Sequence, residues 1–186
     1  MKIDRIEVIR GAVLFPKVLK NGDRLDSIAE FYSGPTKVLT VDSVNTDPTT
    51  GWAMNKGGIL AESDLQTLPL RFLCDYRADN GKKVLFIYKA TNERNNCIVT
   101  ARDLTEDDRT LVSLIPNPAH GWKSIITSVL FHSIGTDGDG SHGCLTADGW
   151  RAIMTFFEIG EKGLFILKRS PNWAAPDEYR RAGEMA

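Results

Sequence analysis

Residues 131–144 read FHSIGTDGDGSHGC, and most of the fold and chemistry that the sequence predicts depends on this stretch. It begins in a run rich in Ile, Val and Phe, residues 124–134, which is typical of a β-strand. Residues 137–143 contain three glycines, which allow tight turns and a close approach of the backbone to a ligand. The sequence therefore predicts a strand, then a glycine-dense loop, and then Cys144 at the end of that loop.

The segments on either side of this stretch predict a β-dominated α+β domain. Residues 82–90 and 97–104 are β-branched and aromatic runs joined by a polar turn at 92–96, which is typical of a β-hairpin. Residues 3–19 predict one or two strands, and residues 163–168 predict another. A parallel fold of alternating strands and helices would need more helices than the sequence offers. We therefore expect strands to dominate the fold.

A helix is predicted shortly after Cys144. Four apolar residues fall at the i, i+3, i+4, i+7 spacing of a buried helix face: Trp150, Ile153, Met154 and Phe157. Thr146 is the candidate N-cap of this helix, and Gly160 is its candidate end. The N-terminus of the helix would lie close to Cys144, where the helix dipole favours a thiolate.

The composition is that of an ordinary globular protein, and it excludes several classes of function. The chain has 186 residues, of which 42% are hydrophobic and 25% charged, and it contains no low-complexity tract typical of disorder. The formal net charge is −1, so no strong overall field attracts nucleic acid or anionic lipid. No apolar run reaches the length of a membrane span. Residues 1–5 lack the apolar core of a secretory signal, which predicts synthesis in the cytoplasm.

The chain has three cysteines and three histidines, so any thiol or imidazole chemistry depends on six residues. An odd number of cysteines leaves at least one thiol outside any disulfide within the chain. Cys74 and Cys97 lie in apolar, strand-like surroundings, which predicts buried and unreactive thiols. The sequence has no Cys-x-x-Cys pair and no helical spacing of histidines, so we expect neither a metal nor a cofactor.

Cys144 is the candidate nucleophile, and its base must precede it because no histidine follows it in the sequence. His132 ends the predicted strand, and the eleven residues between it and Cys144 allow the loop to fold back and bring the two together. His142 is less suitable because a side chain two residues before the thiol should point elsewhere, and His120 is expected to lie in a loop. A buried structural thiol is the alternative interpretation of Cys144.

Residues 141–145 read SHGCL, and together with the upstream His132 they resemble the signature of L,D-transpeptidases of the YkuD type. The resemblance implies a β-rich domain with a mixed sheet and a helix following the catalytic cysteine. It also implies that Cys144 is the nucleophile and His132 the base. No cofactor is implied.

The same resemblance implies roles for the residues around these two. Ser141 would support the imidazole of His132 or line the site. The oxyanion hole would consist of backbone N–H groups from three consecutive residues: His142, Gly143 and Cys144. The substrate would contact three further residues: Gly135, Thr136 and Thr146.

The resemblance implies a substrate, the tetrapeptide stem of peptidoglycan. Attack would fall on the amide between meso-diaminopimelate and the terminal D-Ala, and D-Ala would leave as a thioester forms. Water, the amine of another stem or a free D-amino acid would then give hydrolysis, cross-linking or exchange, and the sequence leaves these three outcomes open. Two alternatives stand beside this interpretation: a thiol amidase for another peptide, and a peptidoglycan-binding module with an inactive site.

The chain departs from the common family pattern at three points. The spacing from His132 to Cys144 is shorter than in most members, and Ser133 stands where many have Gly. Thr146 replaces the Arg or Asn that usually follows the apolar residue after the cysteine. The short spacing resembles the compact toxins of this type that type VI secretion systems deliver. That resemblance implies antibacterial action on the cell wall in the periplasm of a target cell, and an immunity protein as a partner.

Residues 21–32 read NGDRLDSIAEFY and resemble the opening of a LysM glycan-binding module, which would bind N-acetylglucosamine chains. A turn is predicted at residues 21–23, followed by an amphipathic helix that ends at Gly34. Four residues have the helical spacing: Leu25, Ile28, Ala29 and Tyr32. We therefore expect a LysM-like N-terminal region over residues 1–60 and a catalytic domain over residues 61–186. A helix without glycan binding is the alternative for the first region.

Overall fold

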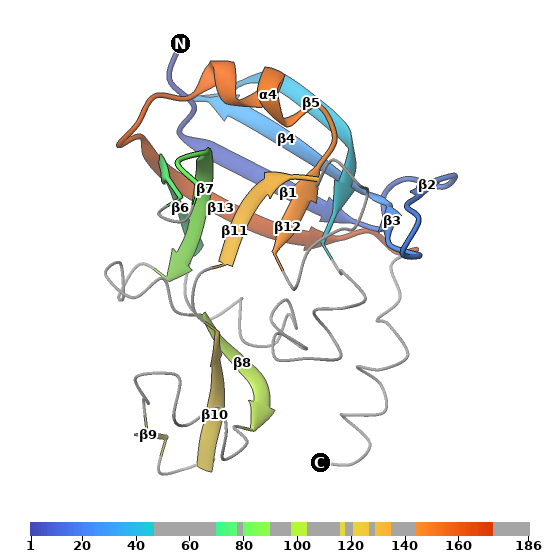
Figure 1. Cartoon of the computed structure of the whole chain (residues 1–186), viewed down its shortest axis with the longest axis vertical. Helices are drawn as coiled ribbons and strands as arrows, with labels where there is room; N and C mark the ends of the chain where they lie inside the picture. The colour runs from blue at the N-terminus through green and yellow to red at the C-terminus, as the bar shows by residue number, and fades with distance from the viewer. Residues whose placement is uncertain are drawn as a thin grey trace.

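Eight strands of the computed structural model close into a β-barrel (Figure 1). The structure describes residues 1–46, 70–77, 80–89, 98–103, 116–117, 121–126, 129–134 and 144–172. In order around the barrel, the strands are β1 (Arg5–Arg10), β13 (Lys162–Arg169), β6 (Leu70–Tyr76), β7 (Lys83–Lys89), β11 (Val129–Ser133), β12 (Leu145–Ala147), β5 (Thr36–Asn45) and β4 (Ser27–Ser33). The pairs β1–β13 and β11–β12 are parallel, and the other neighbours are antiparallel. The expected β-dominated fold with a mixed sheet is therefore confirmed.

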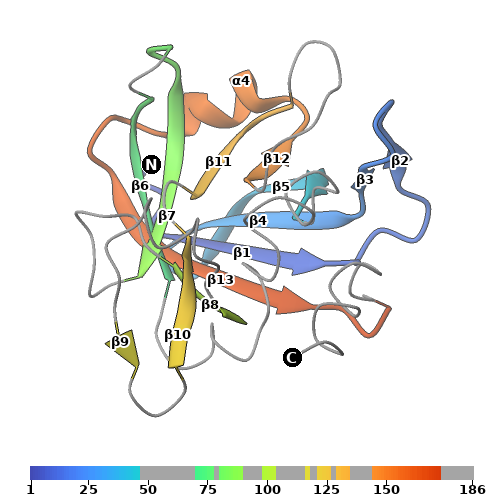
Figure 2. The same ribbon diagram turned by 60° about the horizontal axis from the view of Figure 1, so that its bottom comes forward.

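Two smaller sheets lie outside the barrel. Strands β2 (Lys17–Val18) and β3 (Arg24–Leu25) form a two-stranded sheet, and the turn between them has Gly22 at a φ of 89°. This turn confirms the one predicted at residues 21–23. Strands β8 (Ile98–Asp103), β10 (Gly121–Ile126) and β9 (Pro116–Asn117) form a three-stranded sheet, drawn at the bottom of Figure 2. Within the described ranges, no helix is long and apolar enough to cross a membrane.

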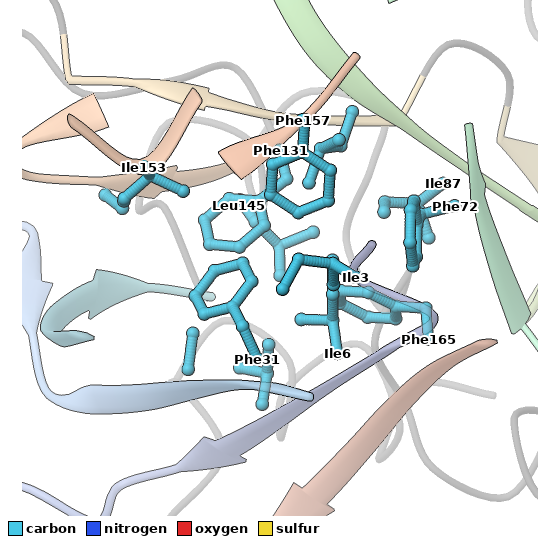
Figure 3. Packing of buried hydrophobic residues seen from close by; sticks show 14 of the residues in the cluster. Ile3, Ile6, Phe31, Phe72, Ile87, Phe131, Leu145, Ile153, Phe157 and Phe165 are labelled. Carbon is cyan, nitrogen blue, oxygen red and sulfur yellow. The ribbon is translucent and has the colours of Figure 1, made fainter. Parts of the chain in front are cut away.

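The core fills the inside of the barrel (Figure 3). Alternate residues of each strand point inward, as the pleat of a strand requires, so one face of each strand carries the large apolar side chains. The largest of these side chains are fully buried: Ile3, Ile6, Phe31, Phe72, Leu85, Ile87, Phe131 and Phe165. The ring of Phe157 packs edge-to-face against the rings of Phe31 and Phe72. The distance between ring centroids is 6.0 Å to Phe31 and 5.7 Å to Phe72.

The helix after Cys144 is shorter than predicted and starts later. Helix α4 spans Trp150–Ile153, and a turn of 3₁₀ helix, η2, continues it over Met154–Phe156. Gly149 rather than Thr146 is its N-cap, because Thr146 lies in strand β12. The four residues predicted to face the core are all buried, which confirms that part of the prediction: Trp150, Ile153, Met154 and Phe157. The segment ends at Phe156, before Gly160.

The predicted pairing of residues 82–90 with 97–104 is wrong, although both segments are strands. β7 pairs with β6 and β11, whereas β8 pairs with β10. The physical reason is burial, because β7 is covered on both faces, with Val84 on one face and Leu85 and Ile87 on the other. A strand of this kind takes two partners inside a sheet, and residues 70–76 supply the second one.

The helix predicted over residues 25–32 is also wrong, because this segment forms β3 and β4. In β4 the buried residues recur at every second position: Ser27, Ala29 and Phe31. The period of two includes Phe31, a residue that the helical spacing leaves out. The LysM resemblance rests on the residues of 21–32 themselves, and glycan binding by this region stays a prediction. The barrel also joins β1, β4 and β5 to strands beyond residue 70, so a boundary near residue 60 does not divide the sheet.

Cys74 is a core thiol, as predicted. It is fully buried, and it and Cys144, the cysteines within the described ranges, are thiols rather than disulfide partners. Burial away from water raises the pKa of the Cys74 thiol to about 11, because the thiolate would lose its hydration. Cys74 is therefore unreactive near neutral pH. Cys97 lies outside the described residues.

Candidate active site

The structure describes three of the residues that the sequence assigns to the site: His132, Cys144 and Thr146. The remaining candidates lie outside the described residues: His120, Gly135, Thr136, Ser141, His142 and Gly143. The strands on both sides of the glycine-dense loop are therefore known. They fix where the loop leaves the barrel and where it returns.

The loop connects two strands that are parallel neighbours, β11 and β12 (Figure 1). Their register places His132 beside Thr146 and Phe131 beside Leu145. Phe131 and Leu145 belong to the core inside the barrel, so His132 and Thr146 point to the outer face. Cys144 comes two residues before Thr146 and therefore shares that outer face.

A second contact supports this placement of Cys144. It packs with Val84 and Leu130 in a small apolar cluster separate from the main core. Leu130 comes two residues before His132, so it also points to the outer face of β11. His132 and Cys144 are thus diagonal neighbours on adjacent strands, for which standard strand spacing gives Cα atoms roughly 8 Å apart. The structure therefore brings the predicted nucleophile and the predicted base to one face.

The prediction that the N-terminus of a helix stabilises a thiolate at Cys144 is wrong. Cys144 is followed by strand β12, and the first helical residue is Trp150. The favourable charge at a helix N-terminus falls off within one turn, so α4 does not act on the thiol directly. Cys144 is only 7% exposed and its known neighbours are apolar, which disfavours an isolated thiolate. The predicted role of Cys144 as a nucleophile therefore requires a proton acceptor such as imidazole.

The imidazole of His132 is held by the main chain. Its Nδ1 lies 2.7 Å from the carbonyl oxygen of Ser133. A carbonyl oxygen only accepts hydrogen bonds, so Nδ1 carries the proton in this contact and Nε2 of the neutral ring carries the lone pair. That is the tautomer in which Nε2 can accept a proton from a thiol. Because the contact uses the carbonyl, the departure from Gly to Ser at position 133 does not affect it.

A row of polar side chains crosses three strands beside the thiol. Thr146 of β12 lies between His132 of β11 and Asn45 of β5, each in direct strand register with it. Thr146 and Asn45 are 0% and 1% exposed, although polar residues at such positions are usually exposed. Two of the three side chains in this row are therefore buried polar groups, which in most proteins are hydrogen-bonded.

The Thr146 hydroxyl has an unusual environment. Its Oγ1 is buried and has no hydrogen-bond partner in the part of the chain that the structure describes. A buried hydroxyl of this kind costs about 1–3 kcal/mol relative to a paired one. The contact between Thr146 and substrate stays a prediction.

Replacing Thr146 with Val tests this assignment, because stability and turnover should change in opposite directions. Val keeps the branched shape and removes the unsatisfied oxygen, so we expect the free energy of unfolding to rise by about 1 kcal/mol. Turnover of substrate should fall because the donor is lost. Urea denaturation measures the first effect and a rate assay the second. A less stable Val variant would show that the hydroxyl is already paired.

An open groove of about 590 Å³ lies at the ends of β11 and β12, on the side of these strands opposite to the His132 side chain. It is lined by the ends of β11 and β12 and by the segment that leads into α4 and η2: Ser133, Ile134, Ala147, Asp148, Gly149, Trp150, Arg151, Ala152 and Thr155. The Trp150 ring packs 4.9 Å from that of Phe131, and its Nε1 donates to the carbonyl of Lys83. These contacts anchor the groove wall to the barrel.

Asp148, at the edge of the groove, forms an ion pair with Lys17 of the β2–β3 sheet. Its carboxylate accepts a hydrogen bond from Lys17 at 3.2 Å and another from the backbone N–H of Gly149 at 3.0 Å. These bonds, that from Lys17 first, lower the pKa of the Asp148 carboxyl group. The negative charge of Asp148 is therefore balanced within the protein.

The lowered pKa makes a prediction about pH. Because the folded-state pKa lies below the unfolded one, Asp148 contributes stability above the unfolded pKa and loses it as pH falls through the folded value. Both side chains are more than half exposed, so the contribution at pH 7 is at most about 1 kcal/mol. Asp148→Asn should remove it at pH 7 and have no effect below both pKa values. Urea midpoints across pH measure this, and an equal loss at every pH would contradict it.

Sequence reasoning did not predict that Asn45 lies beside Thr146 or that the Ser133 carbonyl contacts His132. Asn45 ends an apolar run, which is a visible signal, but its place beside Thr146 depends on the pairing of β5 with β12. Comparisons of this chain with protein-family models, with curated proteins and with solved structures found no match.

Proposed function

We propose that this chain is a thiol-dependent acyl transferase that acts on the tetrapeptide stems of peptidoglycan. The observation that carries the proposal is the placement of Cys144 and His132 on one face of two parallel strands. The contact of His132 Nδ1 with the Ser133 carbonyl supports it, because Nε2 is then the basic atom. The substrate class comes from the resemblance of residues 141–145 to the L,D-transpeptidase signature.

The proposed first step is acylation of the thiol. His132 Nε2 accepts the proton of Cys144, and Sγ attacks the carbonyl carbon between meso-diaminopimelate and the terminal D-Ala. The S–C bond forms as the C–N bond breaks, and His132 returns the proton to the leaving amine. The products are free D-Ala and a thioester on Cys144. The step transfers one acyl group and one proton and changes no oxidation state, so it requires no oxidant or reductant.

The proposed second step decides the product. Water yields a tripeptide, the amine of another stem yields a cross-link, and a free D-amino acid yields an exchanged tetrapeptide. In each case the acceptor gives up a proton to His132, and the thiol of Cys144 is regenerated. The backbone N–H groups of His142, Gly143 and Cys144 are the proposed donors to the oxyanion in both steps.

The test is a product analysis with purified full chain and disaccharide tetrapeptides. We expect release of D-Ala, together with a tripeptide, a cross-linked dimer or an exchanged stem, each identified by mass. A panel of unrelated peptides runs beside it as a control for general thiol amidase activity. If D-Ala is not released, or if only the unrelated peptides are cut, the proposed substrate is wrong.

A further inference from the structure

We propose that the segment leading into the β2–β3 sheet binds the surface of an anionic lipid bilayer. Three apolar side chains within five consecutive residues are exposed there, and together they form the exposed apolar patch: Leu14, Phe15 and Val18. Their exposed fractions are 69%, 94% and 59%, so Phe15 lies almost entirely in water. Single exposed apolar residues are common on protein surfaces, whereas a group of large ones is typical of a binding surface.

The backbone that carries the exposed apolar patch is held by the rest of the chain. The N–H of Val13 donates to the carbonyl oxygen of Asp26 at 2.9 Å. Lys17, which lies within the patch, donates to Asp148 beside α4. Figures 1 and 2 both draw β2 and β3 at the side of the barrel, with the connection between α4 and β13 at the opposite side. The patch is therefore presented on a fixed frame, which reduces the conformational entropy lost on binding.

The exposed charges around the patch are positive. Residues 11–25 contain three exposed charged side chains, and all of them are basic: Lys17, Lys20 and Arg24. Asp23, the one acidic residue of this range, is 1% exposed. Lys17 is balanced by Asp148, whereas no ion pair within the described residues involves Lys20 or Arg24. The net charge of the whole chain is −1, so the attraction of anions is local to this segment.

A small apolar patch beside two cations favours a bilayer over a protein as the occupant. A stable protein–protein interface buries roughly 800 Å² on each partner, more than three side chains supply. It also requires a partner of complementary shape, whereas the surface of a bilayer adapts to a protruding side chain. Phe15 and Leu14 would enter the headgroup region while Lys20 and Arg24 contact the lipid phosphates.

The test is sedimentation of the purified chain with vesicles. One set contains phosphatidylglycerol and phosphatidylcholine in equal parts, and the other contains phosphatidylcholine alone. We expect binding to the first set, binding at least about 10-fold weaker to the second, and release by salt, which screens the attraction of the cations to phosphate. Phe15→Ser should lower the partition coefficient about 10-fold, the fold-change expected for one large apolar side chain. Lys20→Gln should lower it about five-fold.

Each variant has a matched control outside this segment. Ile159→Ser removes an exposed apolar side chain between η2 and β13, and Lys82→Gln removes an exposed lysine between β6 and β7. Both controls should bind anionic vesicles as the wild type does.

Two results would overturn the proposal: no binding of the wild type to anionic vesicles, or equal binding by the wild type and Phe15→Ser. Analytical ultracentrifugation tests the other occupant. A dimer of the wild type that Phe15→Ser abolishes, without binding to vesicles, would assign the patch to a second copy of the chain instead. None of these measurements requires a substrate, so their outcome is independent of the proposed peptidoglycan chemistry.

Discussion

Cys144→Ala is expected to abolish release of D-Ala from tetrapeptide stems, with a loss in kcat of at least about three orders of magnitude. The thiol is the only group in the proposed mechanism that forms a bond to the substrate. The fold should survive, because Cys144 lies in a small cluster with Val84 and Leu130 and not in the main core. We expect a loss of about 1 kcal/mol in the free energy of unfolding, since one buried sulfur is removed.

The matched control is Cys74→Ala, which removes a thiol that is fully buried inside the barrel. This variant should lose some stability and keep its turnover, because Cys74 lies in the core, apart from the outer face that carries His132. Circular dichroism and urea denaturation confirm that both variants are folded, and the rate assay then separates them. Turnover retained in a folded Cys144→Ala protein would rule out the thioester mechanism.

Gly163→Ala is expected to destabilise the fold strongly, although it adds only one methyl group. A Cβ at this position would lie 2.3 Å from the carbonyl oxygen of Asp4 and 2.5 Å from Cε1 of Phe72. One of these atoms belongs to the backbone, and the other to a fully buried ring, so neither can move cheaply. We expect a loss of about 3 kcal/mol or more, which is a large part of the stability of a small domain.

Gly34→Ala is the matched control, since a Cβ there meets no atom within 4 Å. Its backbone has a φ of 56°, so the substitution should cost about 1 kcal/mol through strain alone. Urea denaturation at one temperature compares the two variants. If Gly163→Ala loses no more stability than Gly34→Ala, the close contact of β13 with the start of the chain is not as tight as the structure indicates.

The sequence predicted the strands better than the way they pair. The strand at 163–168 and both apolar runs around residue 90 are confirmed, because β-branched and aromatic residues dominate them. The pairing of β7 with β11, or of β5 with β12, joins segments far apart in the sequence, and local residue types carry no information about it. Segment 25–32 shows a different failure, because its apolar residues fit both a period of 3.6 and a period of two. Burial of Ala29 and Phe31 inside the barrel decides for the strand.

For the site, too, local residue types could be interpreted from the sequence, whereas contacts between distant segments could not. The pairing of Cys144 with an upstream histidine is a prediction from residue type and order within a short loop, and it stays a prediction. The structure added that β11 and β12 are parallel neighbours, which puts both side chains on the outer face. The buried positions of Thr146 and Asn45, and the groove that contains Arg151, depend on strands and a helix from separate parts of the chain. Sequence patterns alone cannot show such contacts.

The most direct test of the Cys144–His132 pair is a pH profile of alkylation by iodoacetamide, resolved for each cysteine by peptide mapping. In the wild type we expect Cys144 to react well below the pH of about 8.5 at which an ordinary thiol ionises, because His132 accepts its proton. His132→Gln should shift the Cys144 profile upward. Cys74, whose pKa is raised to about 11, should stay unmodified at neutral pH and serves as the internal control. A Cys144 profile that is the same with and without the imidazole would contradict the proposed pair.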